Sequence, residues 1–146
     1  MLRPAPWSGK NGKRLRILVA AADTAFNTSL RWTFALMPQV EIVGTAVNGA
    51  ETLRLVGEME PDLAVLDLYL PGIDGWQAGS VIREFYPAAR IIIIGSDETD
   101  EVRNICLDRY ADGFVSRRNY YQELPREISR VLFGPPGTAP MGRVSP

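Results

Sequence analysis

The stretch at residues 63–75 constrains the fold of this chain more than any other. Four apolar residues, 63–66, lead directly into Asp67, and the turn pair Pro71-Gly72 follows shortly afterwards. An uninterrupted apolar run that ends at turn residues is typical of a strand covered on both faces in a parallel sheet. The functional edge of such a sheet lies just beyond the carboxyl ends of its strands. We therefore expect Asp67 at that edge, either as a reactive carboxylate or as a strand end that accepts backbone hydrogen bonds.

The rest of the chain alternates short apolar runs with amphipathic segments. The apolar runs predict five strands, at residues 15–20, 40–46, 63–67, 90–94 and 113–116. Helical spacing of apolar residues predicts five helices, at residues 24–37, 50–59, 75–85, 98–109 and 123–133. Strands that alternate with helices through short connections predict an α/β fold with a doubly wound, five-stranded parallel sheet.

Two of the predicted helices carry features that the structure can test. The fourth helix is expected to turn Val102, Ile105 and Cys106 toward the core, because they share one helical stripe. The last helix contains Pro125, which lacks an amide hydrogen and is best tolerated in a first turn. We therefore place the start of that helix near Glu123.

Composition favours one domain with a tail at each end. The 146 residues suffice for one domain with a real core. Residues 1–13 are basic and rich in Pro, Gly, Lys and Asn, and residues 134–146 are rich in Pro and Gly, so both are predicted to be disordered tails around a domain at 14–133. All 17 acidic residues fall inside that domain, which argues against a nucleic-acid-binding surface. No apolar run is long enough for a bilayer, so no membrane contact and a cytoplasmic location are expected.

The chain contains no histidine and a single cysteine, Cys106. The lack of histidine removes the usual general base, the Ser-His nucleophile pair and the commonest metal ligand. One cysteine excludes an internal disulfide and provides no metal-binding spacing. We therefore expect neither an enzyme nor a bound cofactor, and any chemistry must rest on carboxylates.

Residues 67–75, Asp-Leu-Tyr-Leu-Pro-Gly-Ile-Asp-Gly, resemble the phosphoacceptor loop of response-regulator receiver domains in two-component signalling. The order and spacing of the predicted elements over residues 14–133 are similar to that family as well. The resemblance implies a flavodoxin-like fold with strand order 2-1-3-4-5. It also implies that the aspartate takes a phosphoryl group from a sensor histidine kinase. In the family an acidic pair holds a divalent metal, while a hydroxyl and a lysine contact the phosphoryl oxygens, because a carboxylate attacks a dianion only when cations offset the repulsion.

The resemblance assigns the acceptor position to Asp67, and it gives Tyr69 a backbone carbonyl that could face a metal. The positions of the acidic pair fall on Ala21 and Ala22. Asp23 comes one residue later and is predicted to be the N-cap of the first helix. Since Mg²⁺ demands near-octahedral oxygen coordination, any metal site built from Asp23, Asp67 and Tyr69 is expected to be weak.

The remaining positions of the family's site are also changed. Gly95 occupies the hydroxyl position, with Ser96 as its neighbour, and Arg117 occupies the lysine position. Phe114 stands at the switch aromatic on the fifth strand. Arg117 keeps the positive charge but in a planar fork with different geometry from an ammonium group. In a site without metal, we expect a permanent ion pair between Asp67 and Arg117.

We interpret the chain as an atypical receiver that acts mainly through protein-protein contacts, with impaired Mg-dependent phosphorylation. Its expected partners are a sensor histidine kinase or another signalling protein. A homodimer could form through the face of the fourth helix, fifth strand and fifth helix, which is expected to expose residue types that are enriched at interfaces: Arg103, Arg109, Arg117, Arg118, Tyr120 and Tyr121.

Two alternatives remain open. The first is a receiver still phosphorylated on Asp67, with a non-standard metal site and with Ser96 contacting the phosphoryl group. The second is a small-molecule binder or enzyme on a flavodoxin-like fold. The lack of a Gly-rich phosphate loop weighs against the second alternative.

Overall fold

The computed structural model describes residues 13–96 and 99–134. Most of the two predicted tails, residues 1–12 and 135–146, therefore lies outside the described residues. Strands and helices alternate along the chain as β1 (Leu15–Ala20), α1 (Thr24–Ala35), β2 (Val40–Ala46), α2 (Gly49–Met59), β3 (Leu63–Asp67), α3 (Gly75–Phe85), β4 (Arg90–Gly95), α4 (Asp100–Arg109), β5 (Gly113–Ser116) and α5 (Tyr120–Phe133).

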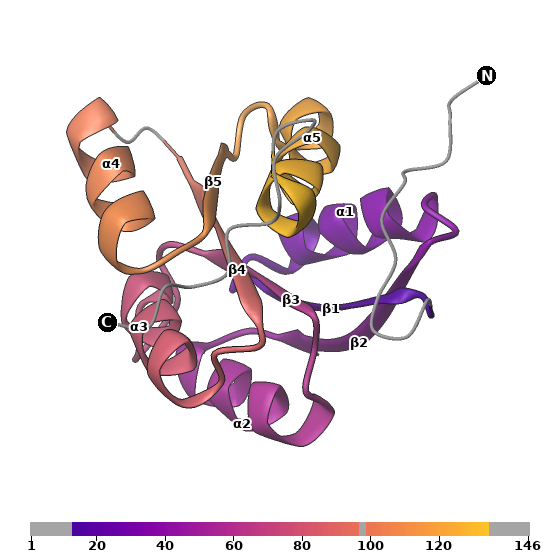
Figure 1. Cartoon of the computed structure of the whole chain (residues 1–146), viewed down its shortest axis with the longest axis horizontal. Coiled ribbons are helices and arrows are strands. Elements are labelled where there is room, and N and C mark those ends of the chain that lie inside the picture. The colour runs from indigo at the N-terminus through magenta and orange to yellow at the C-terminus, as the bar shows by residue number, and fades with distance from the viewer. Residues whose placement is uncertain (1–12, 97–98, 135–146) are drawn as a thin grey trace.

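The five strands form one parallel sheet in the order β2-β1-β3-β4-β5. The prediction of a doubly wound, five-stranded α/β fold with this strand order is confirmed. Helices cover both faces of the sheet, with α1 and α5 on one side and α2 and α3 on the other (Figure 1). Among the described helices, none combines the length and apolar character needed to cross a membrane.

Alternate residues of β3 face opposite layers of the core. Leu63 and Val65 pack with apolar residues of α1 and α5, whereas Ala64 and Leu66 pack with those of α2 and α3. All four residues are fully buried. The two-residue period of a strand separates the two sets, so the continuous apolar run satisfies both layers. The prediction of a strand covered on both faces is therefore confirmed.

The last helix begins earlier than its sequence predicts. α5 starts at Tyr120, where the amides of Gln122 and Glu123 already donate to the Asn119 carbonyl at 3.0 and 2.9 Å. Pro125 consequently lies inside the helix, and its predicted place in the first turn was wrong. An amide at position 125 would bond to the carbonyl of Tyr121. Because proline has no amide hydrogen, that carbonyl accepts no helical hydrogen bond from position 125. Tyr121 is 63% exposed, so this part of the helix lies at the surface.

The fourth helix meets the core less fully than predicted. α4 spans Asp100–Arg109 after the N-cap Thr99, and the predicted start at residue 98 lies outside the described residues. Of the predicted inner stripe only Cys106 is buried, while Val102 and Ile105 are exposed. Helical spacing shows that residues share one face of a helix, but it does not show whether that face packs against the core or faces solvent. α4 packs beside the edge strand β5, so only part of the helix reaches the core.

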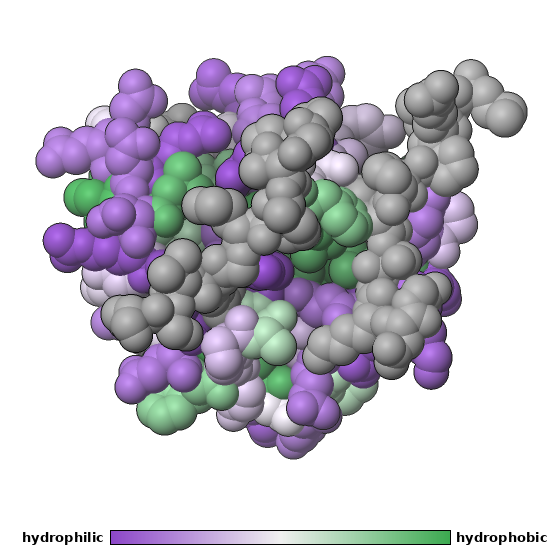
Figure 2. Space-filling view, viewed as in Figure 1, coloured by the Kyte–Doolittle hydropathy of each residue, from purple (hydrophilic) through white to green (hydrophobic). Residues whose placement is uncertain are grey.

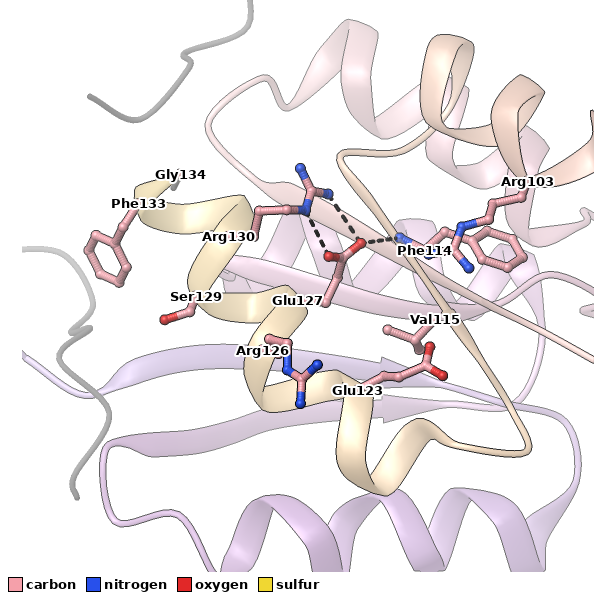
Figure 3. Close-up of a pocket in the computed structure, with 10 residues that line it drawn as sticks. All are labelled: Arg103, Phe114, Val115, Glu123, Arg126, Glu127, Ser129, Arg130, Phe133 and Gly134. Atoms are coloured by element: carbon pink, nitrogen blue, oxygen red, sulfur yellow. Dashed lines mark hydrogen bonds and ion pairs between the residues drawn. The ribbon is translucent and has the colours of Figure 1, made fainter. Parts of the chain in front are cut away.

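The outer edge of β5 is closed by two glutamates of α5. The Phe114 amide donates to Glu127 Oε2 at 2.8 Å (Figure 3), and the Ser116 amide donates to Glu123 Oε1 at 3.0 Å. Two residues along a strand and one turn along a helix span similar lengths, so the two carboxylates match the two edge amides. An edge strand with satisfied amides cannot template pairing with another chain at those positions.

We expect Glu127→Ala to destabilise the fold by about 1–3 kcal/mol, because the Phe114 amide loses its acceptor in a half-buried setting. Urea denaturation followed by circular dichroism measures the change. The matched control is Glu58→Ala, which removes an exposed ion pair with Arg54 and should cost less than about 0.5 kcal/mol. Equal losses for the two variants would contradict the edge-closing role of Glu127.

Candidate functional site

Asp67 lies at the carboxyl end of β3 and is 7% exposed. Its Oδ1 accepts a hydrogen bond from the Tyr69 amide at 3.2 Å, and the Leu68 amide donates to the Ile94 carbonyl at 2.9 Å. The loop then returns so closely that a Cβ at Gly75 would lie 2.1 Å from the Asp67 carbonyl oxygen. A residue with a side chain at position 75 would therefore push the start of α3 away from the end of β3. The glycine allows the two elements to hold Asp67 in place.

Asp23 is the N-cap of α1, as its position after β1 predicts. Its Oδ1 accepts hydrogen bonds from the amides of Ala25 at 3.0 Å and Phe26 at 3.2 Å. The other carboxylate oxygen, Oδ2, accepts a hydrogen bond from Arg117 at 2.6 Å. The Asp23 side chain thus caps α1 and also binds the guanidinium of Arg117.

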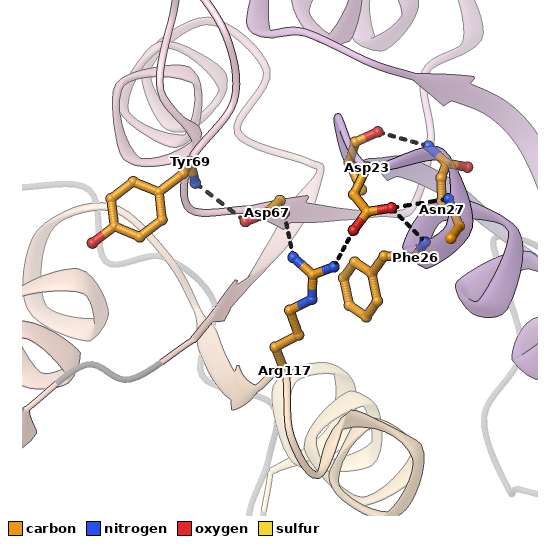
Figure 4. Close-up of polar contacts among 8 residues, drawn as sticks. Asp23, Phe26, Asn27, Asp67, Tyr69 and Arg117 are labelled. Atoms are coloured by element: carbon orange, nitrogen blue, oxygen red, sulfur yellow. Dashed lines mark hydrogen bonds and ion pairs between the residues drawn. The ribbon is translucent and has the colours of Figure 1, made fainter.

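Arg117 follows β5, and its amide donates to the Gly95 carbonyl at 2.6 Å. Its guanidinium lies between two carboxylates (Figure 4): Nη2 is 2.6 Å from Asp23 Oδ2, and Nη1 is 3.9 Å from Asp67 Oδ2. The same guanidinium lies over the Phe26 ring, 4.1 Å from its centroid, and Phe26 packs edge-on against Tyr120. This contact adds a cation-π attraction and limits the directions in which the guanidinium can point.

The predicted Asp67-Arg117 ion pair is present, but it is the longer of the two contacts that Arg117 makes with carboxylates. A separation of 3.9 Å exceeds the length of a hydrogen bond, whereas 2.6 Å is a short, charge-assisted one. The difference follows from helix capping, because the N-cap position directs the Asp23 carboxylate toward the guanidinium. Sequence reasoning treated Asp23 as a cap or a weak metal ligand and missed its pairing with Arg117.

The Arg117 hydrogen bond holds the pKa of Asp23 below its ordinary value, and the amide of Phe26 lowers this pKa further. Both effects act by stabilising the charged carboxylate.

Asn27 is a buried polar residue of this edge that sequence reasoning also missed. Its side-chain amide donates to the carbonyls of Ala21 at 3.0 Å and Ala46 at 3.2 Å, and the Ala21 amide donates to Ala46 as well. Asn27 therefore links the start of α1 to the ends of β1 and β2. A sequence signal for this role was available, because Asn27 directly follows Phe26, a residue of the inner stripe of the predicted first helix.

The other predicted positions surround this edge at different depths. Gly95 is buried at the end of β4, and its neighbour Ser96 is exposed. Phe114 is 4% exposed and packs in the core layer shared with α2 and α3, with the Arg103 guanidinium 5.5 Å from its ring centroid. Within the described ranges, no group of three acidic, histidine or cysteine residues is arranged to hold a metal ion.

A 2-1-3-4-5 parallel sheet with an aspartate at the end of β3 and a cation after β5 defines a receiver domain. The chain belongs to the family described as Response regulator receiver domain, whose sequence model matches residues 17–129.

Relatives of known name are similar in sequence over most of the chain. The protein-glutamate methylesterase/protein-glutamine glutaminase 3 of Geobacter sulfurreducens is 30% identical over 72% of this chain and 28% of its own length. The nitrate/nitrite response regulator protein NarL of Escherichia coli is 26% identical over 85% of this chain and 57% of its own length. The chain thus spans between about a quarter and three fifths of these relatives.

Solved structures share the fold. The signal receiver domain of the putative response regulator NarL from Mycobacterium tuberculosis superposes with a TM-score of 0.75 and 26% identity, over 80% of this chain and 94% of that domain. A chain of the CheX-CheY-BeF3-Mg complex from Borrelia burgdorferi matches with a TM-score of 0.80 and 22% identity, over 88% of this chain and 97% of that chain. The second match shows the fold alone.

We expect a carboxyl NMR titration to give Asp23 a pKa below 3.8, and Arg117→Gln to raise that pKa. A folded-state pKa below the unfolded one stabilises the protein above the unfolded pKa, and this contribution is lost as the pH falls through the folded pKa. Thermal melts between about pH 2 and pH 5 should therefore show that the melting temperature falls less steeply with decreasing pH for Arg117→Gln than for the unchanged protein.

Arg54→Gln, which removes an exposed pair with Glu58, is the control and should leave the Asp23 titration unchanged. An Asp23 titration that does not respond to Arg117→Gln would show that the short contact does not persist in solution.

Proposed function

We propose that the chain is an atypical receiver domain that acts mainly through protein contacts, with impaired Mg-dependent phosphorylation of Asp67. The observation that carries the proposal is the placement of Arg117. Its guanidinium is held by Asp23 at 2.6 Å and lies beside Asp67 at 3.9 Å, so the cation of the site is already shared between two carboxylates.

The residues present do not fit a Mg²⁺ ion well. Such an ion takes six oxygen ligands at short distances. Ala21 and Ala22 offer methyl groups where the family places its acidic pair. The Asp23 carboxylate is engaged through both oxygens, by helix amides on one and by Arg117 on the other. Asp67 and the Tyr69 carbonyl remain as donors, a set too small for this ion.

The site also has few other groups that could assist attack of Asp67 on a phosphoryl dianion. Arg117 brings one positive charge, part of which the Asp23 carboxylate offsets. Gly95 has no hydroxyl, and Ser96 is exposed beyond the end of β4. Without cations and donors to balance the developing charge, the carboxylate is a poor nucleophile.

The face of α4, β5 and α5 is the contact surface in this proposal. Arg103, Arg109, Arg118 and Tyr121 are exposed there, while Tyr120 and Arg117 pack inward toward Phe26 and are not part of the exposed face. Hydrophilic residues make up most of the visible surface around α4 and α5 (Figure 2).

A groove crosses this face over β5, between the two helices (Figure 3). Phe114 and Val115 lie along its floor, with Arg103 of α4 and Arg126 of α5 on either side. Glu123 and Glu127 line the groove as well, so charges of both signs stand beside the two apolar residues of its floor. The occupant in this proposal is a signalling protein such as a sensor histidine kinase, or a second copy of the chain. One structural match comes from a CheX-CheY complex.

The same proposal includes no enzymatic activity, no resident cofactor, no nucleic-acid or membrane contact, and a cytoplasmic location. The acidic balance of the domain supports the part that concerns nucleic acid, because a negative surface repels phosphate backbones.

Titration with Mg²⁺ and beryllofluoride tests the proposal. We expect the amide resonances of Asp67, Gly95 and Phe114 to show no saturable shift at millimolar Mg²⁺, because the acceptor lacks a metal site that could cooperate with it. The readout is a series of ¹H-¹⁵N correlation spectra, with the spectrum in buffer alone as proof of an intact fold.

The matched variant is Ala21→Asp/Ala22→Asp, which restores the acidic pair and should bring on Mg²⁺-dependent shifts at the same amides. Asp67→Asn in that background is the control, since it removes the acceptor and should abolish the response to beryllofluoride. Saturation of the unchanged protein at millimolar Mg²⁺ would contradict the proposal and favour a phosphorylated receiver with unusual ligands.

A further inference from the structure

The groove over β5 includes the point where the chain leaves α5. Phe133, the last residue of α5, and Gly134, its C-cap, line the groove together with Phe114 and Val115 of β5. Figure 3 shows Gly134 at the end of the helix. The groove has a volume of about 900 Å³, near the upper end of the range for binding sites, so it can hold part of a peptide. The residues that follow Gly134 therefore start at the groove.

The backbone changes direction at Gly134. Its amide still donates to the Arg130 carbonyl at 2.7 Å, as in a helix, but its φ of +71° lies in the left-handed region that glycine favours. Pro135 and Pro136 come next, and they cannot continue the helix because proline has no amide hydrogen. The chain therefore leaves the axis of α5 beside the groove.

The twelve residues 135–146 are long enough to follow the groove. An extended, proline-rich chain advances about 3.1 Å per residue, so twelve residues reach about 37 Å. α5 has 14 residues and is about 21 Å long at 1.5 Å per residue. The segment can thus run back beside the whole of α5.

The edge of β5 favours an occupant that does not bind as a strand. Glu127 and Glu123 already accept from the amides of Phe114 and Ser116, so an added strand would find both of these donors taken. A proline-rich segment does not need them, because it docks through its side chains and has few amides of its own to pair. Residues 135–146 contain four prolines, at positions 135, 136, 140 and 146.

Charge favours an occupant that is nearly neutral. The groove combines acidic and basic side chains, so it does not select strongly for either sign: Glu123, Glu127, Arg103, Arg126 and Arg130. Residues 135–146 hold one charged side chain, Arg143, whereas residues 1–12 hold two, Arg3 and Lys10. The segment after α5 is therefore the better match of the two ends of the chain.

We propose that residues 135–146 fold back from Gly134 and cover the groove within the same chain. Met141 and Val144 stand three residues apart, and a polyproline II helix has three residues per turn. In that conformation both side chains lie on one face, which packs against Phe114 and Phe133.

This contact regulates the surface that the proposed function assigns to a partner. The segment occupies the groove first, because it is tethered beside it, and a partner must displace the segment before it binds. The consequence for a partner rests on the proposed function, whereas the docking of the segment does not.

Amide resonances of the full chain in ¹H-¹⁵N spectra test the docking without any partner, metal or phosphoryl group. Met141→Ser/Val144→Ser removes the apolar face of the segment and should shift the amides of Phe114 and Val115, which are distant in sequence. The matched control, Ala139→Ser/Ser145→Ala, changes another face of the segment and should leave both amides unchanged. The amide of Val56 in α2, on the opposite side of the sheet, is the internal reference.

A chain that ends at Gly134 keeps every helix and strand that the structure describes. It should show the same shifts at Phe114 and Val115 as the double serine variant. A synthetic peptide of residues 135–146, added to this shortened chain, should reverse the shifts with saturation. We expect a dissociation constant of about 1 mM or lower, because a short tether gives an effective concentration in the millimolar range.

Three outcomes would overturn the proposal. In the first, the amides of Phe114 and Val115 respond neither to the serine variant nor to the shortened chain. In the second, deletion of residues 1–12 shifts these amides and deletion of residues 135–146 does not, which would assign the groove to the N-terminal segment. In the third, the shifts disappear on dilution, which would assign the groove to a second copy of the chain. The proposed function fails separately, through saturable Mg²⁺-dependent shifts at Asp67 and Gly95.

Discussion

The candidate site depends on one constraint of a parallel sheet: the carboxyl ends of its strands all meet at one edge. Asp23 follows β1, Asp67 ends β3 and Arg117 follows β5. The Arg117 guanidinium therefore contacts both carboxylates, although the three residues lie far apart in sequence. The burial of β3 on both faces fixes its register against β1 and β4, and with it the position of Asp67. The chemistry of the site then follows from which side chains occupy that edge.

At this edge the guanidinium of Arg117 is the cation that contacts both carboxylates, Asp23 and Asp67. Arg117 is shared by two carboxylates and lies over Phe26, so its position is determined by three contacts. An arginine fork can bridge two acceptors in this way, whereas the point charge of a lysine would favour one of them. The arrangement connects the start of α1, the end of β3 and the loop before α5.

The two surface hollows differ in what surrounds them. The groove over β5 has arginines and glutamates beside Phe114 and Val115, whereas the hollow between α3 and α4, which Tyr69, Trp76 and Tyr110 line, has uncharged walls. Arg103 of α4 lines the first, and Val102, Ile105 and Cys106 of α4 line the second. α4 therefore takes part in both surfaces, which explains why so little of it is committed to the core.

Strand order, the alternation of elements and the place of Asp67 could be predicted from the sequence, because apolar periodicity and turn residues are local signals and the family resemblance supplied the topology. The cap role of Asp23 was predictable for the same reason. The sequence did not predict the Asp23-Arg117 contact, the link from Asn27 to two strands, the Pro125 inside α5 or the outward face of α4. Each of these depends on what a residue meets across the fold, and periodicity within one element carries no information about the neighbouring element. The sequence by itself determined which elements form and which charges stand at their ends; only the tertiary structure decided which of those charges pair.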